Sequence, residues 1–148
     1  MRVVEGNILD VRNGVIIQQV NCQGVMGAGF AKAVRYKYPK VYEEYNEICR
    51  KLSPKGLFGC VQFVEVDDGL TIANSFSQYG FGDPAKTGKA YTDSRMLVAN
   101  INYVIEKFPE RKIYIPFGIG AGLGGGDWKV ISSNLADLDI TAVKLPRR

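Results

Sequence analysis

The residues best suited to chemistry in this chain are glycines that follow an apolar, strand-like segment at residues 113–116. They occupy positions Gly118, Gly120, Gly122, Gly124, Gly125 and Gly126, and a helix-like segment begins after Asp127. Glycine lets the backbone turn sharply and approach a ligand closely, because no Cβ atom is in the way. The amides of such a turn can converge on an anion at the positive end of the next helix. The stretch therefore predicts a phosphate-binding loop, rather than a flexible linker, in which Ser or Pro would be more frequent.

A second glycine-rich turn stands in the same position between a strand and a helix. Residues 15–21 are rich in β-branched side chains, which predicts a buried strand, and they run directly into a turn at residues 22–30. In open α/β sheets, ligands bind outside the carboxyl ends of neighbouring strands. We therefore expect the two glycine-rich turns to lie together and to line one cleft.

The absence of histidine limits the chemistry that the chain can perform. It excludes a Ser-His-Asp triad, a Cys-His pair, an HExxH zinc site and an imidazole general base from this chain alone. The three cysteines, Cys22, Cys49 and Cys60, are widely spaced, which predicts reduced thiols and neither a disulfide framework nor a metal site. Catalysis would need carboxylates, lysines, amides, backbone dipoles or the substrate itself, and we expect no metal and no cofactor.

The charge balance favours anionic partners only weakly, with a formal net charge of +4 and a pI near 9.0. Basic residues gather in two places, Lys32, Arg35, Lys37 and Lys40 in one and Lys86 and Lys89 in the other. We interpret them as a solvated helix face and a mobile loop, with a nucleic-acid patch as the alternative, because neither aromatic interleaving nor a nucleic-acid motif accompanies them. No leader-like start or long apolar run is visible, which predicts a cytoplasmic protein without a membrane span.

The remaining pattern predicts one domain over residues 1–148, a three-layer α/β/α sandwich with a mixed central sheet. Strands are expected at 2–5, 15–21, 60–66, 70–76, 113–116 and 140–145, and helices at 31–38, 39–52, 92–108 and after Asp127. Asp67-Asp68-Gly69 predicts a hairpin between the third and fourth strands. The polar loop at residues 78–89 is too long for a simple connection, which indicates a functional loop. We expect a monomer.

Two common nucleotide motifs fit the chain poorly. Gly120, Gly122 and Gly125 satisfy GxGxxG, but a dinucleotide fold needs further sheet and a ribose-binding acid, and only 22 residues follow Gly126. Residues 82–89 have the wrong spacing for a P-loop, and Ala90 stands where a magnesium-binding Ser or Thr belongs. A Rossmann or P-loop enzyme is therefore the disfavoured alternative.

Four motifs taken together resemble the macrodomain family, whose members bind ADP-ribose. They are Gly6-Asn7-Ile8, Val20-Asn21 leading to Met26 through Ala31, Ile72-Ala73-Asn74 leading to Gln78, and Ile119 through Leu123 leading to Trp128. They follow the family's order over essentially the whole chain. The sequence looks most similar to the branch that contains ADP-ribose 1''-phosphate phosphatases and the terminal ADP-ribose protein glycohydrolase.

The resemblance implies a set of ligand-binding residues. Asn7 would replace the family's acidic residue that binds adenine, with the Ile8 amide beside it. Asn21 and the backbone of Gly27, Ala28, Gly29 and Phe30 would hold the distal ribose and a phosphate. The diphosphate would be wrapped by Gly120, Ala121, Gly122, Leu123, Gly124 and Gly125, and Gly118 and Ile119 just before them would also bind the ligand. Tyr91 or Tyr79 would stack on adenine or close the loop, with core packing as the alternative.

The catalytic residues of the related glycohydrolase do not carry over. Its lysine corresponds to Ser75 or Phe76 here, and its aspartate to Gly124. The remaining candidates are Asp127, to orient water, with helix capping as the alternative, and Asn21, to position a hydroxyl or a water. A phosphate on the substrate can also serve as base.

The expected function is binding of ADP-ribose and hydrolysis of a derivative at its distal ribose, with ADP-ribose 1''-phosphate as the first substrate. One alternative is a reader or sequestering module without turnover. Another is a glycohydrolase that acts on ADP-ribosylated protein or nucleic acid. The expected partners are accordingly ADP-ribose, its derivatives and ADP-ribosylated macromolecules.

Overall fold

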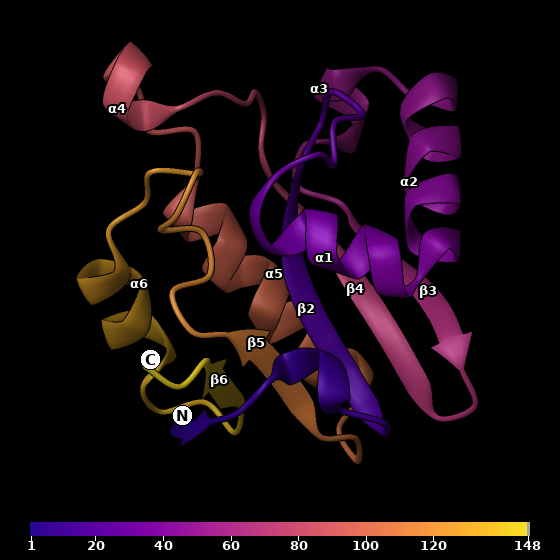
Figure 1. Cartoon of the computed structure of the whole chain (residues 1–148), viewed down its shortest axis with the longest axis vertical. Coiled ribbons are helices and arrows are strands. Elements are labelled where there is room, and N and C mark those ends of the chain that lie inside the picture. The colour runs from indigo at the N-terminus through magenta and orange to yellow at the C-terminus, as the bar shows by residue number, and fades with distance from the viewer. Residues whose placement is uncertain (148) are drawn as a thin grey trace.

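A six-stranded sheet forms the middle layer of the protein in the computed structural model, which describes residues 1–147 (Figure 1). The order of strands across the sheet is β1-β6-β5-β2-β4-β3. All neighbouring pairs are parallel except β3 and β4, which form an antiparallel hairpin. The strands span Arg2–Glu5 (β1), Gly14–Asn21 (β2), Val61–Asp67 (β3), Leu70–Gln78 (β4), Ile113–Pro116 (β5) and Thr141–Lys144 (β6).

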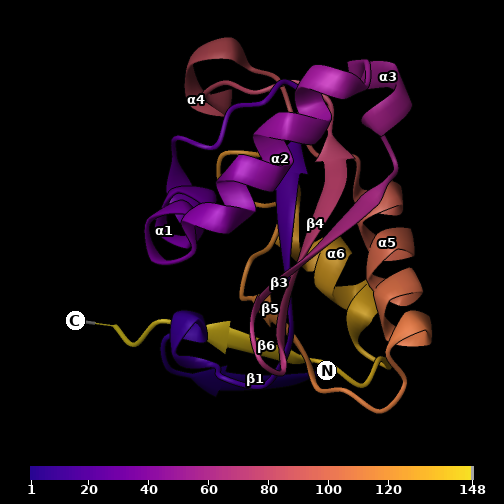
Figure 2. The same cartoon turned by 90° about the vertical axis from the view of Figure 1, so that its right-hand side faces the viewer.

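Helices cover both faces of this sheet, which gives the three layers seen edge-on in Figure 2. On one face lie α1 (Gly29–Lys37), α2 (Pro39–Lys51) and the short α3 (Pro54–Leu57), and on the other α5 (Ser94–Lys107) and α6 (Trp128–Leu135). A 3-10 helix, η1 (Ile8–Asp10), follows β1, and α4 (Pro84–Thr87) lies in the loop after β4. The structure confirms the predicted sandwich with a mixed sheet.

Strand β2 explains why the sheet needs a layer on each side. Ile16 and Val20 pack into the cluster that contains Val34 of α1 and Tyr45 of α2. Val15 and Ile17 point to the opposite face, into the cluster that contains Leu97 and Ile101 of α5 and Ile131 and Leu135 of α6. A strand that is apolar on both faces is stable only when both faces are covered.

The elements that sequence periodicity did not predict are short and capped by side chains. Asn7 caps η1, Ser53 caps α3 and Asp83 caps α4. Four or fewer residues are too few to show a helical period, so only the capping residues marked these turns.

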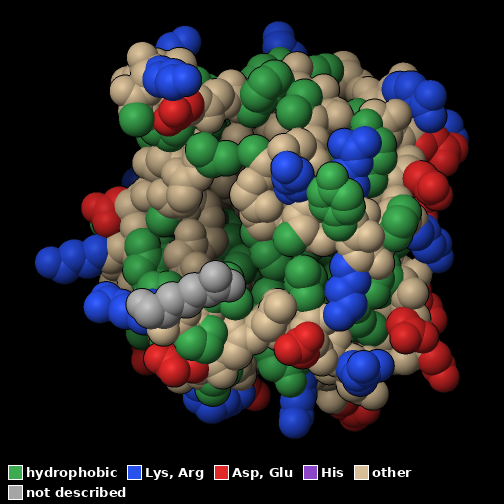
Figure 3. Space-filling model, in the orientation of Figure 1, with side chains coloured by type: hydrophobic (Ala, Val, Ile, Leu, Met, Phe, Trp, Pro, Cys, Tyr) green, Lys and Arg blue, Asp and Glu red, His purple; other side chains and the backbone are tan. Residues whose placement is uncertain are grey.

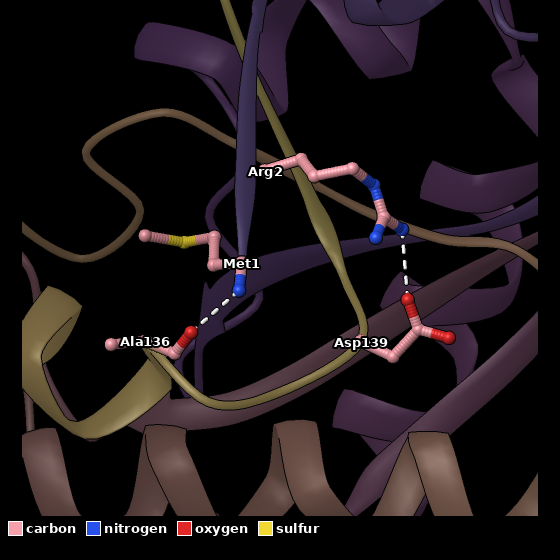
Figure 4. A network of polar contacts seen from close by, with 4 residues as sticks. All are labelled: Met1, Arg2, Ala136 and Asp139. Atoms are coloured by element: carbon pink, nitrogen blue, oxygen red, sulfur yellow. Dashed lines mark hydrogen bonds and ion pairs between the residues drawn. The ribbon is translucent and has the colours of Figure 1, made fainter.

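The N-terminal strand is fixed to the segment that precedes β6 (Figure 4). The Met1 amino group donates to the Ala136 carbonyl at 2.6 Å, and Arg2 pairs with Asp139 at 2.8 Å. Both side chains of this ion pair are largely exposed, so it contributes little to stability. Among residues 1–147, no helix has the length and apolar character needed to cross a membrane.

Candidate functional site

Both glycine-rich turns border one cleft of about 660 Å³. It opens at the carboxyl ends of the adjacent parallel strands β2 and β5, and Figure 3 shows the surface hollowed beside α1. The turns come close together, since a Cβ built on Gly29 would lie 3.8 Å from Leu123 Cδ1. The lining comprises residues from both turns and from the loop after β4: Gln19, Val20, Asn21, Val25, Gly27, Ala28, Gly29, Phe30, Ala31, Gln78, Phe81, Gly82, Asp83, Pro116, Phe117, Gly118, Ile119, Gly120, Gly122, Leu123 and Gly124.

The loop after β5 is folded by its own backbone. The Ala121 amide donates to the Gly118 carbonyl at 2.9 Å, and the Gly126 amide donates to the Gly120 carbonyl at 2.9 Å. Within the described chain, several other amides of this loop donate to no protein acceptor, namely those of Gly118, Gly120, Gly122, Leu123 and Gly124. All five of these residues line the cleft, so they present free donors beside it.

A relay of side-chain hydrogen bonds holds this loop to the protein interior. It begins on α5, where Asn100 donates to Ser75 Oγ at 2.9 Å, and Ser75 donates to Ser77 Oγ at 3.0 Å. Ser77 then donates to Gln19 Oε1 at 2.7 Å, and Gln19 donates to Thr92 Oγ1 at 2.8 Å.

The relay ends where the Thr92 hydroxyl donates to the Gly120 carbonyl at 2.6 Å. The Thr92 amide also donates to the Gly124 carbonyl at 2.9 Å. Thr92 therefore fixes two points of the glycine loop.

The surroundings of Gly120 and Gly124 leave no room for a side chain. Gly120 has φ +78°, and a Cβ there would stand 2.9 Å from Leu97 Cδ2. At Gly124 a Cβ would stand 2.1 Å from Thr92 Oγ1 and 2.8 Å from the Gly120 carbonyl oxygen. A side chain at either position would push the loop away from the residues that hold it.

Asn21 organises the first turn. Its Oδ1 accepts from the Gln23 amide at 2.9 Å and from the Tyr45 hydroxyl at 2.9 Å, and its Nδ2 donates to the Val25 carbonyl at 2.7 Å. The same hydroxyl lies 2.8 Å from the Asn21 carbonyl oxygen, so its one proton is shared between the two oxygens of Asn21. Burial raises the pKa of Tyr45, which keeps its hydroxyl protonated and able to donate. Asn21 lines the cleft, and one N–H of its Nδ2 remains for a ligand.

Helix α1 begins at the cleft without a capping side chain, because its N-cap residue is Ala28. In the part of the chain that the structure describes, the amides of Gly27, Ala28, Gly29 and Phe30 donate to no protein acceptor. Side chains cap α3, α4, α5 and α6. The open start of α1 therefore adds a helix dipole and free donors to the cleft, which favours an anion there.

Several predicted site residues lie outside the lining of the cleft. Asn7 Oδ1 accepts from the Leu9 amide at 3.0 Å, and Ile8 is buried in the core. The Asp127 carboxylate accepts from the Lys129 amide at 2.9 Å, so it caps α6 as the capping alternative predicted. Ala121 and Gly125 belong to the loop but do not line the cleft.

Tyr91 holds the loop after β4 in place instead of facing the cleft. Its amide donates to the Gly124 carbonyl at 2.7 Å, and its hydroxyl donates to Thr87 Oγ1 at 2.9 Å. Closure of the loop over a ligand by Tyr91 stays a prediction. Stacking of Tyr91 on adenine remains a prediction from the resemblance.

The structure adds residues that sequence reasoning missed, chiefly Gln19, Phe81, Asp83 and Phe117. Phe81 is 52% exposed and Phe117 packs on Trp128 with ring centroids 5.0 Å apart. Asp83 is the one ionisable residue among those that line the cleft in residues 1–147. The length and polarity of the 78–89 loop were the available signal for Phe81 and Asp83. No comparable signal marked Gln19, whose partners are remote in the sequence.

Free backbone amides and the open start of α1 are the groups that can bind an anion in this cleft, whose lining in the described residues contains no Lys or Arg. The same part of the chain contains no group of three or more Cys, Asp or Glu side chains placed to hold a metal ion. Asp83 Oδ1 accepts from the Ala85 amide at 3.0 Å, which leaves its second oxygen for a ligand or a water. The free amides suit the anionic part of a ligand, and the remaining N–H of Asn21 and the second oxygen of Asp83 suit its hydroxyl groups.

No protein-family model matches the chain, but individual relatives do. A DNA ADP-ribosyl glycohydrolase of Mycobacterium tuberculosis is 26% identical in an alignment 147 residues long that covers 95% of this chain and 40% of that protein. An ADP-ribose 1''-phosphate phosphatase of Aspergillus clavatus is 36% identical over 72 residues, which are 48% of this chain and 36% of that protein. The chain thus spans about two fifths of the length of these curated relatives or less.

Solved structures match the fold along almost the whole chain. A Bacteroides thetaiotaomicron protein of unknown function is 24% identical with a TM-score of 0.82, covering 97% of both chains. The macrodomain of Mycobacterium tuberculosis DarG is 25% identical with a TM-score of 0.75, covering 99% of this chain and 97% of that one. Thermosipho africanus DarTG in complex with ADP-ribose is 21% identical with a TM-score of 0.72, and the match covers 99% of this chain and 43% of that one. These likenesses confirm the resemblance predicted from the sequence, and the chain is a macrodomain in fold.

Proposed function

We propose that the protein binds ADP-ribose in this cleft and hydrolyses a derivative of it at the distal ribose. The observation that carries the proposal is the pair of turns whose free amides, together with the uncapped start of α1, line one cleft. Hydrogen bonds from such amides to charged phosphate oxygens contribute about 1.5–3 kcal/mol each, so a few suffice for micromolar affinity. The Thermosipho africanus structure, which contains ADP-ribose, supports this choice of ligand.

The first substrate that we propose is ADP-ribose 1''-phosphate. Water attacks the phosphorus, the bond from phosphorus to the ribose oxygen breaks, and a proton passes from the water to that oxygen. The products are ADP-ribose and inorganic phosphate. Asp83 orients the water, because it brings the one carboxylate into the lining of the cleft in the described chain. Asn21 positions the ribose through its remaining N–H.

Calorimetry with ADP-ribose, AMP and NAD tests the ligand. ADP-ribose is expected to bind more tightly than the other two, and equal or absent binding would remove the proposal. Phosphate release from ADP-ribose 1''-phosphate is then compared between the parent, Asp83→Asn and Asn21→Ala. Asp83→Asn should bind ADP-ribose as the parent does and release phosphate at least about tenfold more slowly.

A reader without turnover is the outcome if ADP-ribose binds and the parent releases no phosphate. One structural observation favours it: Ser75 and Phe76, which stand where the related glycohydrolase has lysine, are both fully buried. Neither side chain can reach a ligand in the cleft.

De-ADP-ribosylation is the second candidate activity. The match to DNA ADP-ribosyl glycohydrolases extends over 95% of the chain, against 48% for the Aspergillus clavatus phosphatase. In that reaction the leaving group on the distal ribose is a macromolecule instead of phosphate.

A further inference from the structure

A second hollow lies beside the cleft, on the outer side of α1 and α2. Its volume is about 540 Å³, and we call it the α1–α2 groove. Its lining is Met26, Gly27, Lys32, Arg35, Tyr36, Pro39, Tyr42 and Glu43. Gly27 lines both the cleft and the groove, and a Cβ built on Gly27 meets no atom within 4 Å. The rim that the two hollows share is therefore low and open.

The groove combines cations with aromatic rings. The Arg35 guanidinium carbon lies 3.6 Å above the centroid of the Tyr42 ring, an arrangement that fixes the guanidinium by cation–π attraction. Tyr36 is 77% exposed, so its ring is available for stacking. The three ion pairs within residues 1–147 involve neither Lys32 nor Arg35. Figure 3 shows Lys and Arg side chains beside hydrophobic ones over α1.

The four basic residues that cluster in the sequence, at positions 32, 35, 37 and 40, take two different roles in the structure. Lys37 donates to the Leu9 carbonyl, and Lys40 donates to the Glu65 carbonyl at 2.8 Å, so both serve the fold. Lys32 and Arg35 remain in the groove, where α2 brings Tyr42 to them. The aromatic interleaving that the linear sequence did not indicate is thus produced by the packing of α2 on α1.

We propose that the α1–α2 groove binds a single strand of nucleic acid that carries the ADP-ribose held in the cleft. Lys32 and Arg35 contact backbone phosphates, and a base stacks on Tyr36. The proposal rests on the proposed function, in which Asn21 positions the distal ribose, and Gly27 lines the same cleft as Asn21. A substituent on that ribose then leaves the cleft across Gly27 and enters the groove. A concave site receives a flexible strand, whereas a duplex is read by an element that protrudes into its grooves.

Fluorescence anisotropy with a short, labelled oligothymidine tests the groove. The full chain is compared with Lys32→Ala/Arg35→Ala and with a matched control, Arg95→Ala/Lys129→Ala, which removes the same charge from exposed positions in α5 and α6. The groove variant should bind about tenfold more weakly at low salt, and its slope of log affinity against log salt should fall by about 1.4, or about 0.7 for each lost phosphate contact. The affinity of the control variant for the oligothymidine should differ from that of the parent by less than about twofold.

Tyr36→Ala should weaken oligothymidine binding at least about fivefold, because a base–aromatic stack is lost. Equal losses of affinity for the oligothymidine in the groove and control variants would overturn the proposal. A parent protein that does not bind the strand at low salt would overturn it as well. If polyglutamate displaces the labelled strand as effectively as unlabelled oligothymidine does, the groove would be assigned to acidic proteins instead.

Calorimetry with ADP-ribose on the same variants separates the two proposals, and all should bind it as the parent does. A parent that binds ADP-ribose but not the strand refutes the groove alone. Absence of ADP-ribose binding refutes the proposed function, and the strand titrations then report on the groove by itself.

Discussion

Gly124→Ala offers the sharpest test of the glycine loop. The new methyl group would stand 2.1 Å from Thr92 Oγ1, 2.8 Å from the Gly120 carbonyl oxygen and 2.9 Å from Gln19 Nε2. Overpacking of this kind costs about 1–3 kcal/mol. Rotating Thr92 away breaks its bonds to Gly120 and Gln19, at about 1 kcal/mol each. We therefore expect a loss of about 2–4 kcal/mol, and a fall in Tm of about 5–15 °C at roughly 2–4 °C per kcal/mol.

Gly122→Ala is the matched control, because a Cβ there meets no atom within 4 Å and needs no left-handed backbone. Its Tm in a calorimetric scan should lie within about 2 °C of the parent. Combining Gly124→Ala with Thr92→Ala should cost less than the sum of the two single changes, since the 2.1 Å contact is gone. A Tm for Gly124→Ala equal to that of Gly122→Ala would refute the reasoning.

Tyr45→Phe removes the hydroxyl that donates to Asn21, while Oδ1 keeps its bond from the Gln23 amide. Chemical denaturation should show a loss of about 1–3 kcal/mol, and calorimetry should show weaker ADP-ribose binding; unchanged values would remove Asn21 as the organiser of the first turn. Asp127→Ala removes the cap of α6, so the free energy of unfolding should fall by about 1 kcal/mol while the affinity for ADP-ribose stays the same. A loss of turnover in this variant would restore Asp127 as a catalytic residue. Burial raises the pKa of Cys22 from 9.0 to about 11, so the folded state favours the neutral thiol. The stability that this thiol contributes is complete below pH 9 and is lost as the pH rises through about 11. Thermal scans across that range should show a smaller decline for Cys22→Ala, and equal declines would contradict the assignment.

The layers and the hairpin could be predicted because they depend on local patterns. Asp67-Asp68-Gly69 marks a turn by residue type alone, and β2 is rich in β-branched apolar residues. The two glycine turns could be predicted in the same way, since a strand and a helix flank each. Their meeting followed from a rule about parallel sheets.

The partners that shape the site could not be predicted from these patterns. Gln19 and Thr92 are 73 residues apart, and Ser77 is 58 residues from Gln19. No spacing rule connects such positions, because the sheet and α5 bring them together. Asn7 is assigned a ligand contact from the family resemblance, and the structure adds that its side chain caps η1, a local role that the resemblance did not indicate. Asp83 is likewise a cap, of α4, and reaches the cleft only because the loop after β4 folds over it.

The relay from Asn100 to Gly120 links the shape of the binding loop to the folding of the whole molecule. A peptide containing only residues 113–135 would lack every side chain of that relay and should show no affinity for the ligand. By thermodynamic linkage, a ligand that selects the assembled loop must also protect α5 and the central strands. Amide hydrogen exchange in α5, remote from the bound molecule, should therefore slow when ADP-ribose is added.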